Sequence, residues 1–261
     1  MRTDRSRGWA VVAGLAVLST GLLAGSRAPE ASVTVSAAIS LTDCLEAVAR
    51  VYANEGGAPV RFNFAASNVL SRQIVSGAPV DLFISADDAQ MDLAARAGAI
   101  DVKTRVPLVG NRLAVVTLPG GPSIRDIREL LQPGVRRIAI GDPAAVPAGK
   151  YARDYLLRVG LWEALAAKLV PVSNVRAALG AVENGSADVA ITYETDAADA
   201  HKARAALIVS GPAAPRIVYP AAVVSAAPNR PGAERLLAYL RGQAAAAIFR
   251  QHKFVPLDSG A

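Results

Sequence analysis

The chain has 261 residues, of which 52% are hydrophobic and 5% aromatic, so it can build one large or two modest domains with a core of alanine, valine and leucine. The net charge of +6 would suit a nucleic-acid-binding protein, but four arginines against two acidic residues place +2 of it in the first 31 residues. No basic run is interleaved with aromatic residues, which argues against nucleic acid as a partner.

The N-terminal segment has the pattern of a secretory signal peptide. Three arginines precede an apolar run at residues 9–23 that is short for a membrane span, and small residues follow at 24–26. We therefore predict a signal peptide over residues 1–31 and a soluble, exported mature protein. A retained N-terminal anchor is the alternative. No cysteine follows the apolar run, so lipid attachment at that point is excluded.

Strand and helix patterns alternate through the first part of the mature chain. Short strands are predicted at residues 33–38, 60–64 and 80–85, and each leads into a helical pattern. Ser40 and Ser67 stand at the first two strand-to-helix turns, and Ala86 stands at the third. Three consecutive units therefore present small or hydroxyl-bearing residues at the same end of a sheet.

The single cysteine and the two histidines suggest no chemistry of their own. Cys44 cannot form an internal disulfide and lies on the apolar face of a helix predicted over residues 41–52, so we predict a buried core residue rather than a nucleophile. His201 and His252 lie in charged surroundings without metal-ligand spacing, and we predict that both are on the surface.

The central block contains a turn suited to an anion. A strand at residues 111–118 is followed by a glycine and proline cluster, and a later strand at 138–141 leads into a turn with Pro147 and Gly149 before a helical pattern from Tyr151. Small residues before a helix leave its first N–H groups bare, and with the helix dipole these favour an anion. An ordinary turn that binds nothing is the alternative, but several turns in the chain look alike.

The remaining elements complete a two-lobed prediction. Ser173 or Asn174 can cap a helix that begins at Val175, and a strand at residues 188–193 ends with Tyr193. A long strand at 217–225 precedes two C-terminal helices. The alternation predicts an α/β fold with mostly parallel sheets.

Two long strands, near residues 112 and 222, bracket the central block, which suits two lobes joined by two hinge crossings. The predicted boundaries are residues 32–112 plus 222–261 for lobe I and residues 113–221 for lobe II. In open α/β sheets, ligands bind beyond the carboxyl ends of the strands. Those ends carry residues from both lobes: Ser40, Ser67, Ala86, Ala148, Val175 and Tyr193. This arrangement indicates a hinged capture protein.

The chain also resembles a known family, the periplasmic molybdate-binding proteins of ABC importers, over essentially all of residues 33–256. The resemblance is carried by AISLTD (38–43), ASNVLSRQIVSGAPVDLFISAD (66–87), LVGNRLAVV (108–116), GDPAAVPAGKYARDYL (141–156), VRAALGAVENG (175–185), YPAAVV (219–224) and IFRQHKF (248–254). It implies a type II periplasmic binding protein fold, in which each lobe is a mostly parallel sheet flanked by helices.

The same resemblance implies a function and a binding site. The protein would be a monomer, not an enzyme, that captures molybdate and tungstate in the periplasm for an ABC import permease, without a cofactor. The metal would arrive as its oxyanion and be held by neutral donors alone. These are the hydroxyls of Ser40 and Ser67, the phenol of Tyr193 and the backbone N–H groups near Ser40, Ser67, Ala148 and Val175, with Ala86 lining the pocket. The chain departs from the family pattern around both serines, at Ile39, Asp43, Cys44, Ala66 and Asn68.

Three alternatives remain. A receptor for another tetrahedral oxyanion, such as sulfate or phosphate, would have the same architecture. A hydrolytic enzyme would need a base beside a serine, and the chain has neither that arrangement nor a G-x-S-x-G, S-x-x-K, P-loop or G-x-G-x-x-G motif. A transcriptional effector domain would need a DNA-binding helix-turn-helix rather than an export signal. Lys150 is a candidate charged ligand, but we predict that its ammonium points to solvent.

Overall fold

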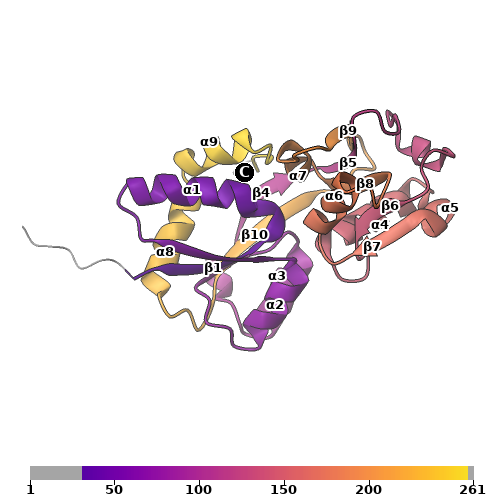
Figure 1. Ribbon diagram of the computed structural model, residues 1–261. Helices are drawn as coiled ribbons and strands as arrows, with labels where there is room; N and C mark the ends of the chain where they lie inside the picture. The colour runs from indigo at the N-terminus through magenta and orange to yellow at the C-terminus, as the bar shows by residue number, and fades with distance from the viewer. Residues whose placement is uncertain (1–30, 258–261) are drawn as a thin grey trace, which may run out of the picture.

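The structure, a computed structural model, describes residues 31–257, and the predicted signal peptide lies outside these residues except for Ala31. Residues 31–257 form two lobes, each built around its own five-stranded sheet with helices packed against it (Figure 1). Within this part of the chain, each helix is either too short or insufficiently apolar to cross a membrane.

The sheet of lobe I contains strands from both ends of the described chain. Its order is β2-β1-β3-β10-β4, and β1 pairs in parallel with both β2 and β3. β10 runs antiparallel to its neighbours β3 and β4, so four strands point one way and one opposes them. The strands are β1 (Val33–Ala38), β2 (Val60–Ala65), β3 (Leu82–Ile84), β4 (Val106–Asn111) and β10 (Ile217–Val223).

The sheet of lobe II repeats this arrangement with the central block of the chain. Its order is β7-β6-β8-β5-β9, with β6 parallel to β7 and β8 and with β5 antiparallel to β8 and β9. The strands are β5 (Leu113–Thr117), β6 (Ile138–Gly141), β7 (Leu169–Val172), β8 (Val189–Tyr193) and β9 (Arg204–Ile208). One strand in each sheet runs opposite to the other four: β10 in lobe I and β5 in lobe II. Each of these two strands adjoins a crossing between the lobes.

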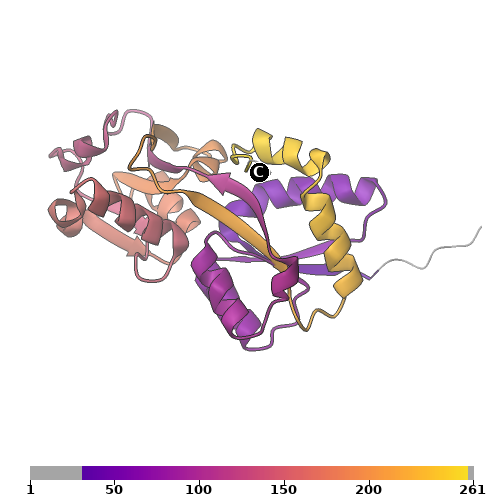
Figure 2. The same cartoon turned by 180° about the vertical axis from the view of Figure 1, so that it is seen from behind.

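The two crossings lie side by side on the back of the molecule (Figure 2). Only Arg112 separates β4 in lobe I from β5 in lobe II, so the predicted strand at 111–118 is divided between the two sheets. The chain returns between β9 and β10. The lobe boundary expected between residues 221 and 222 falls inside β10, all of which pairs within the lobe I sheet. Strand pairing thus places the second crossing before Ile217.

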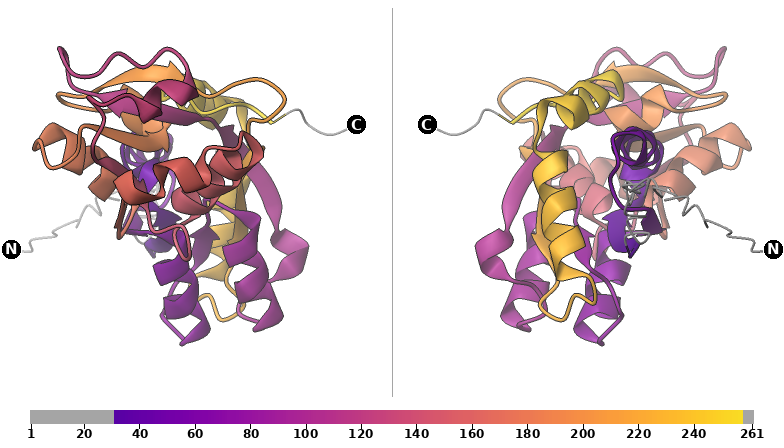
Figure 3. Two further views of the ribbon diagram at one scale, coloured as in Figure 1. Left: turned by 90° about the vertical axis from the view of Figure 1, so that its right-hand side faces the viewer. Right: turned by 90° about the vertical axis from the view of Figure 1, so that its left-hand side faces the viewer.

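Helices cover both faces of each sheet. In lobe I, α1 (Thr42–Asn54), α8 (Arg230–Leu240) and α9 (Gln243–Gln251) pack on one face, whereas α2 (Ser67–Val75) and α3 (Asp88–Arg96) pack on the other. The end-on views show the C-terminal helices beside the lobe that contains the N-terminal strands (Figure 3). Successive strand residues alternate between the two faces, so Phe83 packs against α2 and α3 while Ile84 packs on the opposite side.

Lobe II follows the same rule. Its main helices, α4 (Pro147–Arg158) and α6 (Val175–Glu183), contact β6 and β8 and belong to different apolar clusters, one on each face of the sheet. The shorter elements are η1 (Ile39–Leu41), η2 (Val102–Thr104), η3 (Ile127–Leu131), α5 (Trp162–Leu165), η4 (Ala166–Lys168) and α7 (Glu194–Ala198).

The start of α4 differs from the sequence prediction. The helix begins at Pro147 rather than Tyr151, because proline has no N–H to lose at the first helical position and its fixed φ suits a helix. Gly149 then lies inside the first turn, where a Cβ would stand 1.9 Å from the carbonyl oxygen of Gly141. The helix N-terminus therefore rests directly on the end of β6, and only glycine permits that approach.

Cys44 is fully buried in α1 and is a free cysteine, as predicted. Burial is the largest cause of the raised pKa of its thiol, and the nearby carboxylates Asp199 and Asp43 act in the same direction. His201 is exposed. His252 is partly exposed, with Nδ1 lying 3.4 Å from a carboxylate oxygen of Asp199.

Candidate functional site

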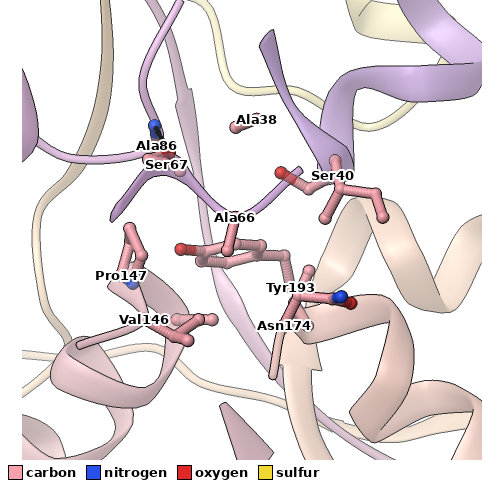
Figure 4. Close-up of a pocket in the computed structure, with 12 residues that line it drawn as sticks. Ala38, Ser40, Ala66, Ser67, Ala86, Val146, Pro147, Asn174 and Tyr193 are labelled. Carbon is pink, nitrogen blue, oxygen red and sulfur yellow. Dashed lines mark hydrogen bonds between the residues drawn. The ribbon is translucent and has the colours of Figure 1, made fainter. Parts of the chain in front are cut away.

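A cavity lies between the two lobes, at the carboxyl ends of their parallel strands, and Figure 4 shows residues that line it. It is lined by Ala38, Ile39, Ser40, Ala66, Ser67 and Ala86 from lobe I and by Val146, Pro147, Ala148, Asn174, Val175 and Tyr193 from lobe II. The structure thus brings all six sequence-predicted site residues together around one space. Their role as ligand-binding residues remains a prediction.

Ser67 presents a hydroxyl from the first residue of α2. Its Oγ accepts a hydrogen bond of 2.9 Å from the backbone N–H of Ala86, which follows the neighbouring strand β3. Since a hydroxyl carries one proton and this oxygen is already an acceptor, the proton of Ser67 remains available for a group in the cavity. Ala86 therefore lines the pocket and also orients the serine beside it.

Ser40 occupies the corresponding position after β1, in the short helix η1 that precedes α1. Its Oγ lies 2.9 Å from the phenolic oxygen of Tyr219, a fully buried residue of β10. The amide Nδ2 of Asn111 lies 3.2 Å from the same phenolic oxygen. The Ser40 hydroxyl thus contacts Tyr219 of β10, and Tyr219 in turn contacts Asn111 of β4. Both strands adjoin the hinge.

Lobe II contributes two helix N-termini. In α6 the side chain of Asn174 accepts the N–H of Ala177 at 2.8 Å. The N–H of Val175 has no intrahelical acceptor, because Val175 is the first residue of the helix. In α4 the first N–H that can face the cavity belongs to Ala148, because Pro147 has none. Both N-termini add the positive end of a helix dipole to the site.

Tyr193 ends β8 and projects its ring between the residues of the two lobes (Figure 4). Its side chain is 1% exposed, and its hydroxyl has no hydrogen-bond partner among the described residues. Burial raises the pKa of the phenol well above its ordinary value, so it keeps its proton and can donate. An unpaired buried donor is costly, which indicates that a bound molecule completes this site.

The residues that line the cavity carry no charged side chain. Lys150 is not among them, although it belongs to α4. Serine hydroxyls, a phenol and backbone N–H groups at helix N-termini make the site a set of neutral donors. Such a set suits an anion, because helix N-termini supply positive potential without a full charge.

An ion-pair cluster lies behind α6 and joins the lobes. Arg176 Nη2 lies 2.6 Å from Asp43 of α1 in the opposite lobe and 3.4 Å from Asp199 in its own lobe. Its Nε lies 2.7 Å from the fully buried Asp196 without hydrogen-bond geometry, so that pairing is electrostatic. Burial raises the pKa of Asp196 to about 6, whereas the charge of Arg176 opposes that rise. Asp43, one of the departures from the family pattern, thus takes part in a contact between the lobes.

Sequence reasoning missed several residues of this region. Tyr219 and Asn111 sit within apolar strand patterns, and nothing local marks them as partners of Ser40. Arg176 follows Val175 directly, but its carboxylate partners come from distant segments. The wall-forming residues Ile39, Val146 and Pro147 flank predicted positions, and their proximity to those positions was the available signal.

Comparison with known sequences gives consistent matches over nearly the whole chain. Residues 33–255 match the family described as bacterial extracellular solute-binding proteins. The chain is 38% identical to the molybdate-binding protein ModA of Escherichia coli, over 95% of this chain and 98% of that protein. It is 33% identical to the molybdate-binding protein ModA of Haemophilus influenzae, over 92% of this chain and 98% of that protein.

Solved structures give the same result. The substrate-binding domain of a putative molybdenum ABC transporter from Clostridium difficile is 29% identical and superposes with a TM-score of 0.69, over 87% of this chain and 99% of that one. The sulfate-binding protein SubI of Mycobacterium tuberculosis has a TM-score of 0.78 at 22% identity, over 88% of each chain, and shares the fold. The predicted two-lobed α/β architecture is confirmed.

Proposed function

Because the chain belongs to the family of bacterial extracellular solute-binding proteins, we propose that it captures molybdate, and with it tungstate, for an ABC importer. The observation that carries this proposal is the cavity between the lobes, whose polar groups are neutral donors and include the unpartnered hydroxyl of Tyr193. The relatives named molybdate-binding protein, which match almost end to end, support the choice of ligand.

A neutral donor set can bind a dianion reversibly. Each hydrogen bond to a charged group contributes about 1.5–3 kcal/mol, so several of them offset the loss of hydration of the anion. A lysine or arginine in the cavity would add attraction but would also slow release. The ligand-binding groups in this proposal are the hydroxyls of Ser40, Ser67 and Tyr193 with the backbone N–H groups near Ser40, Ser67, Ala148 and Val175, and Ala86 lines the pocket.

The donor character of the site supports selection by protonation state. Ser67 Oγ already accepts the Ala86 N–H, so this hydroxyl has a proton to give to a ligand. An oxyanion that retains a proton, such as monohydrogen phosphate, needs an acceptor for its O–H and would leave that group unpaired. Molybdate at neutral pH carries no proton, so it leaves no O–H group unpaired in this site.

Cavity size would select among fully ionised tetrahedral oxyanions. Sulfate has the same charge and shape as molybdate but shorter bonds to oxygen, so its oxygens would leave the donors stretched. Tungstate has nearly the size of molybdate, and we expect little discrimination between the two. A sulfate receptor is the alternative function, and the fold shared with a sulfate-binding protein is the observation that favours it.

The family and the sequence support a setting for this activity. We propose that the N-terminal residues 1–31 direct export, that the mature monomer works in the periplasm, and that it delivers its ligand to a membrane permease. The protein would act by binding alone, without catalysis and without a resident cofactor. The anion itself is the cargo.

Isothermal titration of the purified protein with molybdate, tungstate, sulfate and phosphate tests the proposal. We expect submicromolar affinity for molybdate and tungstate, much weaker binding of sulfate and no measurable binding of phosphate. If sulfate alone bound with submicromolar affinity, sulfate rather than molybdate would be the assigned ligand. Metal analysis of protein purified from medium containing molybdate provides an independent check.

A further inference from the structure

A chain of hydrogen bonds runs from the hinge to Ser40. Asn111, the last residue of β4, accepts the backbone N–H of Arg112 on its Oδ1 at 2.8 Å. Its Nδ2 lies 3.2 Å from the phenolic oxygen of Tyr219 and 3.0 Å from Oγ1 of Thr195 in lobe II. The Tyr219 oxygen lies 2.9 Å from Oγ of Ser40, which lines the cavity.

The backbone N–H of Arg112 sets the direction of the hydrogen bonds that Asn111 makes. The backbone N–H of Arg112 can only donate, so the atom of the Asn111 amide that faces it must be the oxygen. The nitrogen of that amide then faces Tyr219 and Thr195. Because an amide NH₂ group can only donate, both hydroxyl oxygens accept from it.

Tyr219 connects Asn111 to Ser40. Its oxygen accepts from Asn111, and the other partner within hydrogen-bond distance among the described residues is Ser40 Oγ. The ring is fully buried, and burial raises the pKa of the phenol above its ordinary value, so the proton stays on Tyr219. A buried phenol proton needs an acceptor, and Ser40 Oγ is the one within reach, so we infer that Tyr219 donates to Ser40 and that the proton of Ser40 is left for the cavity.

We propose that Asn111 and Tyr219 are positioning residues that hold the Ser40 hydroxyl as a hydrogen-bond donor to the bound oxyanion. This inference rests on the proposed function, since it assigns these residues a role toward the same ligand. Ser67 is oriented in a similar way by a single contact, because its oxygen accepts a hydrogen bond directly from the Ala86 N–H. In both serines a protein group occupies an acceptor site of the oxygen, so the proton of each hydroxyl is free to be donated to the ligand.

A double-mutant cycle on molybdate affinity tests whether Tyr219 acts through Ser40. The proteins are the wild type, Ser40→Ala, Tyr219→Phe and the double variant, each titrated with molybdate. We expect Ser40→Ala to weaken binding about tenfold or more and Tyr219→Phe to weaken it about fivefold. In the Ser40→Ala background, Tyr219→Phe should change the affinity less than twofold. Tyr239→Phe, which removes a phenol hydroxyl elsewhere in lobe I, is the matched control and should leave affinity unchanged.

Two results would overturn the proposal: the same loss from Tyr219→Phe in both backgrounds, or no loss in the wild-type background. The first would mean that Tyr219 supports the lobe in general rather than Ser40. If Tyr219→Phe does not fold, Asn111→Ala takes its place in the same cycle, because it leaves the aromatic packing intact. A wild-type protein that binds none of the four oxyanions would instead remove the proposed function, and with it this inference.

Discussion

Tyr193→Phe should change ligand affinity and ligand-free stability in different ways. The substitution removes one hydroxyl from a residue that is 1% exposed and whose oxygen has no partner among the described residues. If that hydroxyl donates to the oxyanion, its loss costs about 1.5–3 kcal/mol of binding, which is about a 10- to 150-fold weaker affinity. The ligand-free protein loses no hydrogen bond, so its stability should stay unchanged or rise.

The neighbouring tyrosine provides a contrast for the stability measurement. The rings of Tyr193 and Tyr219 lie 5.9 Å apart, but the Tyr219 hydroxyl has partners in Ser40 and Asn111. Tyr219→Phe should therefore lower the free energy of unfolding by about 1–3 kcal/mol, because it leaves buried polar groups unpaired. The control for affinity is Tyr155→Phe. Tyr155 is a buried tyrosine of lobe II, as Tyr193 is, but it does not line the cavity.

Isothermal titration with molybdate gives the affinities, and denaturant unfolding of ligand-stripped protein gives the stabilities. An affinity of Tyr193→Phe equal to that of the wild type would place the ligand elsewhere. A loss of ligand-free stability as large as that of Tyr219→Phe would show that the Tyr193 hydroxyl has a protein partner, and the reasoning from an unpaired donor would fail.

Three further predictions follow from the same contacts. Ser67→Ala should weaken molybdate binding tenfold or more, while Ser71→Ala, one turn along α2 and outside the cavity, should not; equal affinities in titration would exclude Ser67 as a ligand. Asp43→Asn removes the 2.6 Å ion pair between the lobes and should speed molybdate release two- to fivefold in stopped-flow measurements. The control is Asp92→Asn, which breaks a comparably exposed ion pair within lobe I and should leave the release rate unchanged. Because the folded pKa of Asp196 is raised from 3.8 to about 6, its contribution to stability is full below pH 4 and is lost as the pH rises through 6. Relative to the wild type, Asp196→Asn should therefore gain unfolding free energy on the order of 2 kcal/mol between pH 4 and 7.5, and a pH-independent difference would contradict the assignment.

The elements that face the cavity could be predicted from sequence because each depends on a local pattern. Ser67 was predicted at a strand-to-helix turn, one residue before the expected helix, and α2 begins at Ser67 itself. The helix predicted from Val175 begins at that residue in α6. The early start of α4 was missed because Pro147 was assigned to the turn. A proline fits the first helical turn as well as a loop, and only the contact of Gly149 with Gly141 distinguishes the two.

The groups that orient the site could not be predicted in this way. Ser40 and Tyr219 are 179 positions apart, and Arg176 and Asp43 are 133 apart. No local periodicity relates such pairs, because their distances depend on how two strands and two lobes pack. Tyr219 also lies in a strand whose other residues are apolar, so the sequence gives no sign of a polar role for its hydroxyl. That role becomes visible when the fold places Ser40 beside it.

If the proposed donors bind the oxyanion, their division between the lobes couples binding to closure. Ser40 and Ser67 belong to lobe I, whereas Ala148, Val175 and Tyr193 belong to lobe II, so an oxyanion that contacts one lobe alone would meet about half of its donors. A ligand shifts a conformational equilibrium only by the difference in its affinity for the two states. On the proposed function, that difference would be the hydrogen bonds from the second lobe, each worth about 1.5–3 kcal/mol. The direct ion pair between the lobes at Arg176 and Asp43 is partly exposed and therefore contributes less. The anion, rather than the protein's own contacts, should therefore provide most of the free energy that keeps the cavity closed.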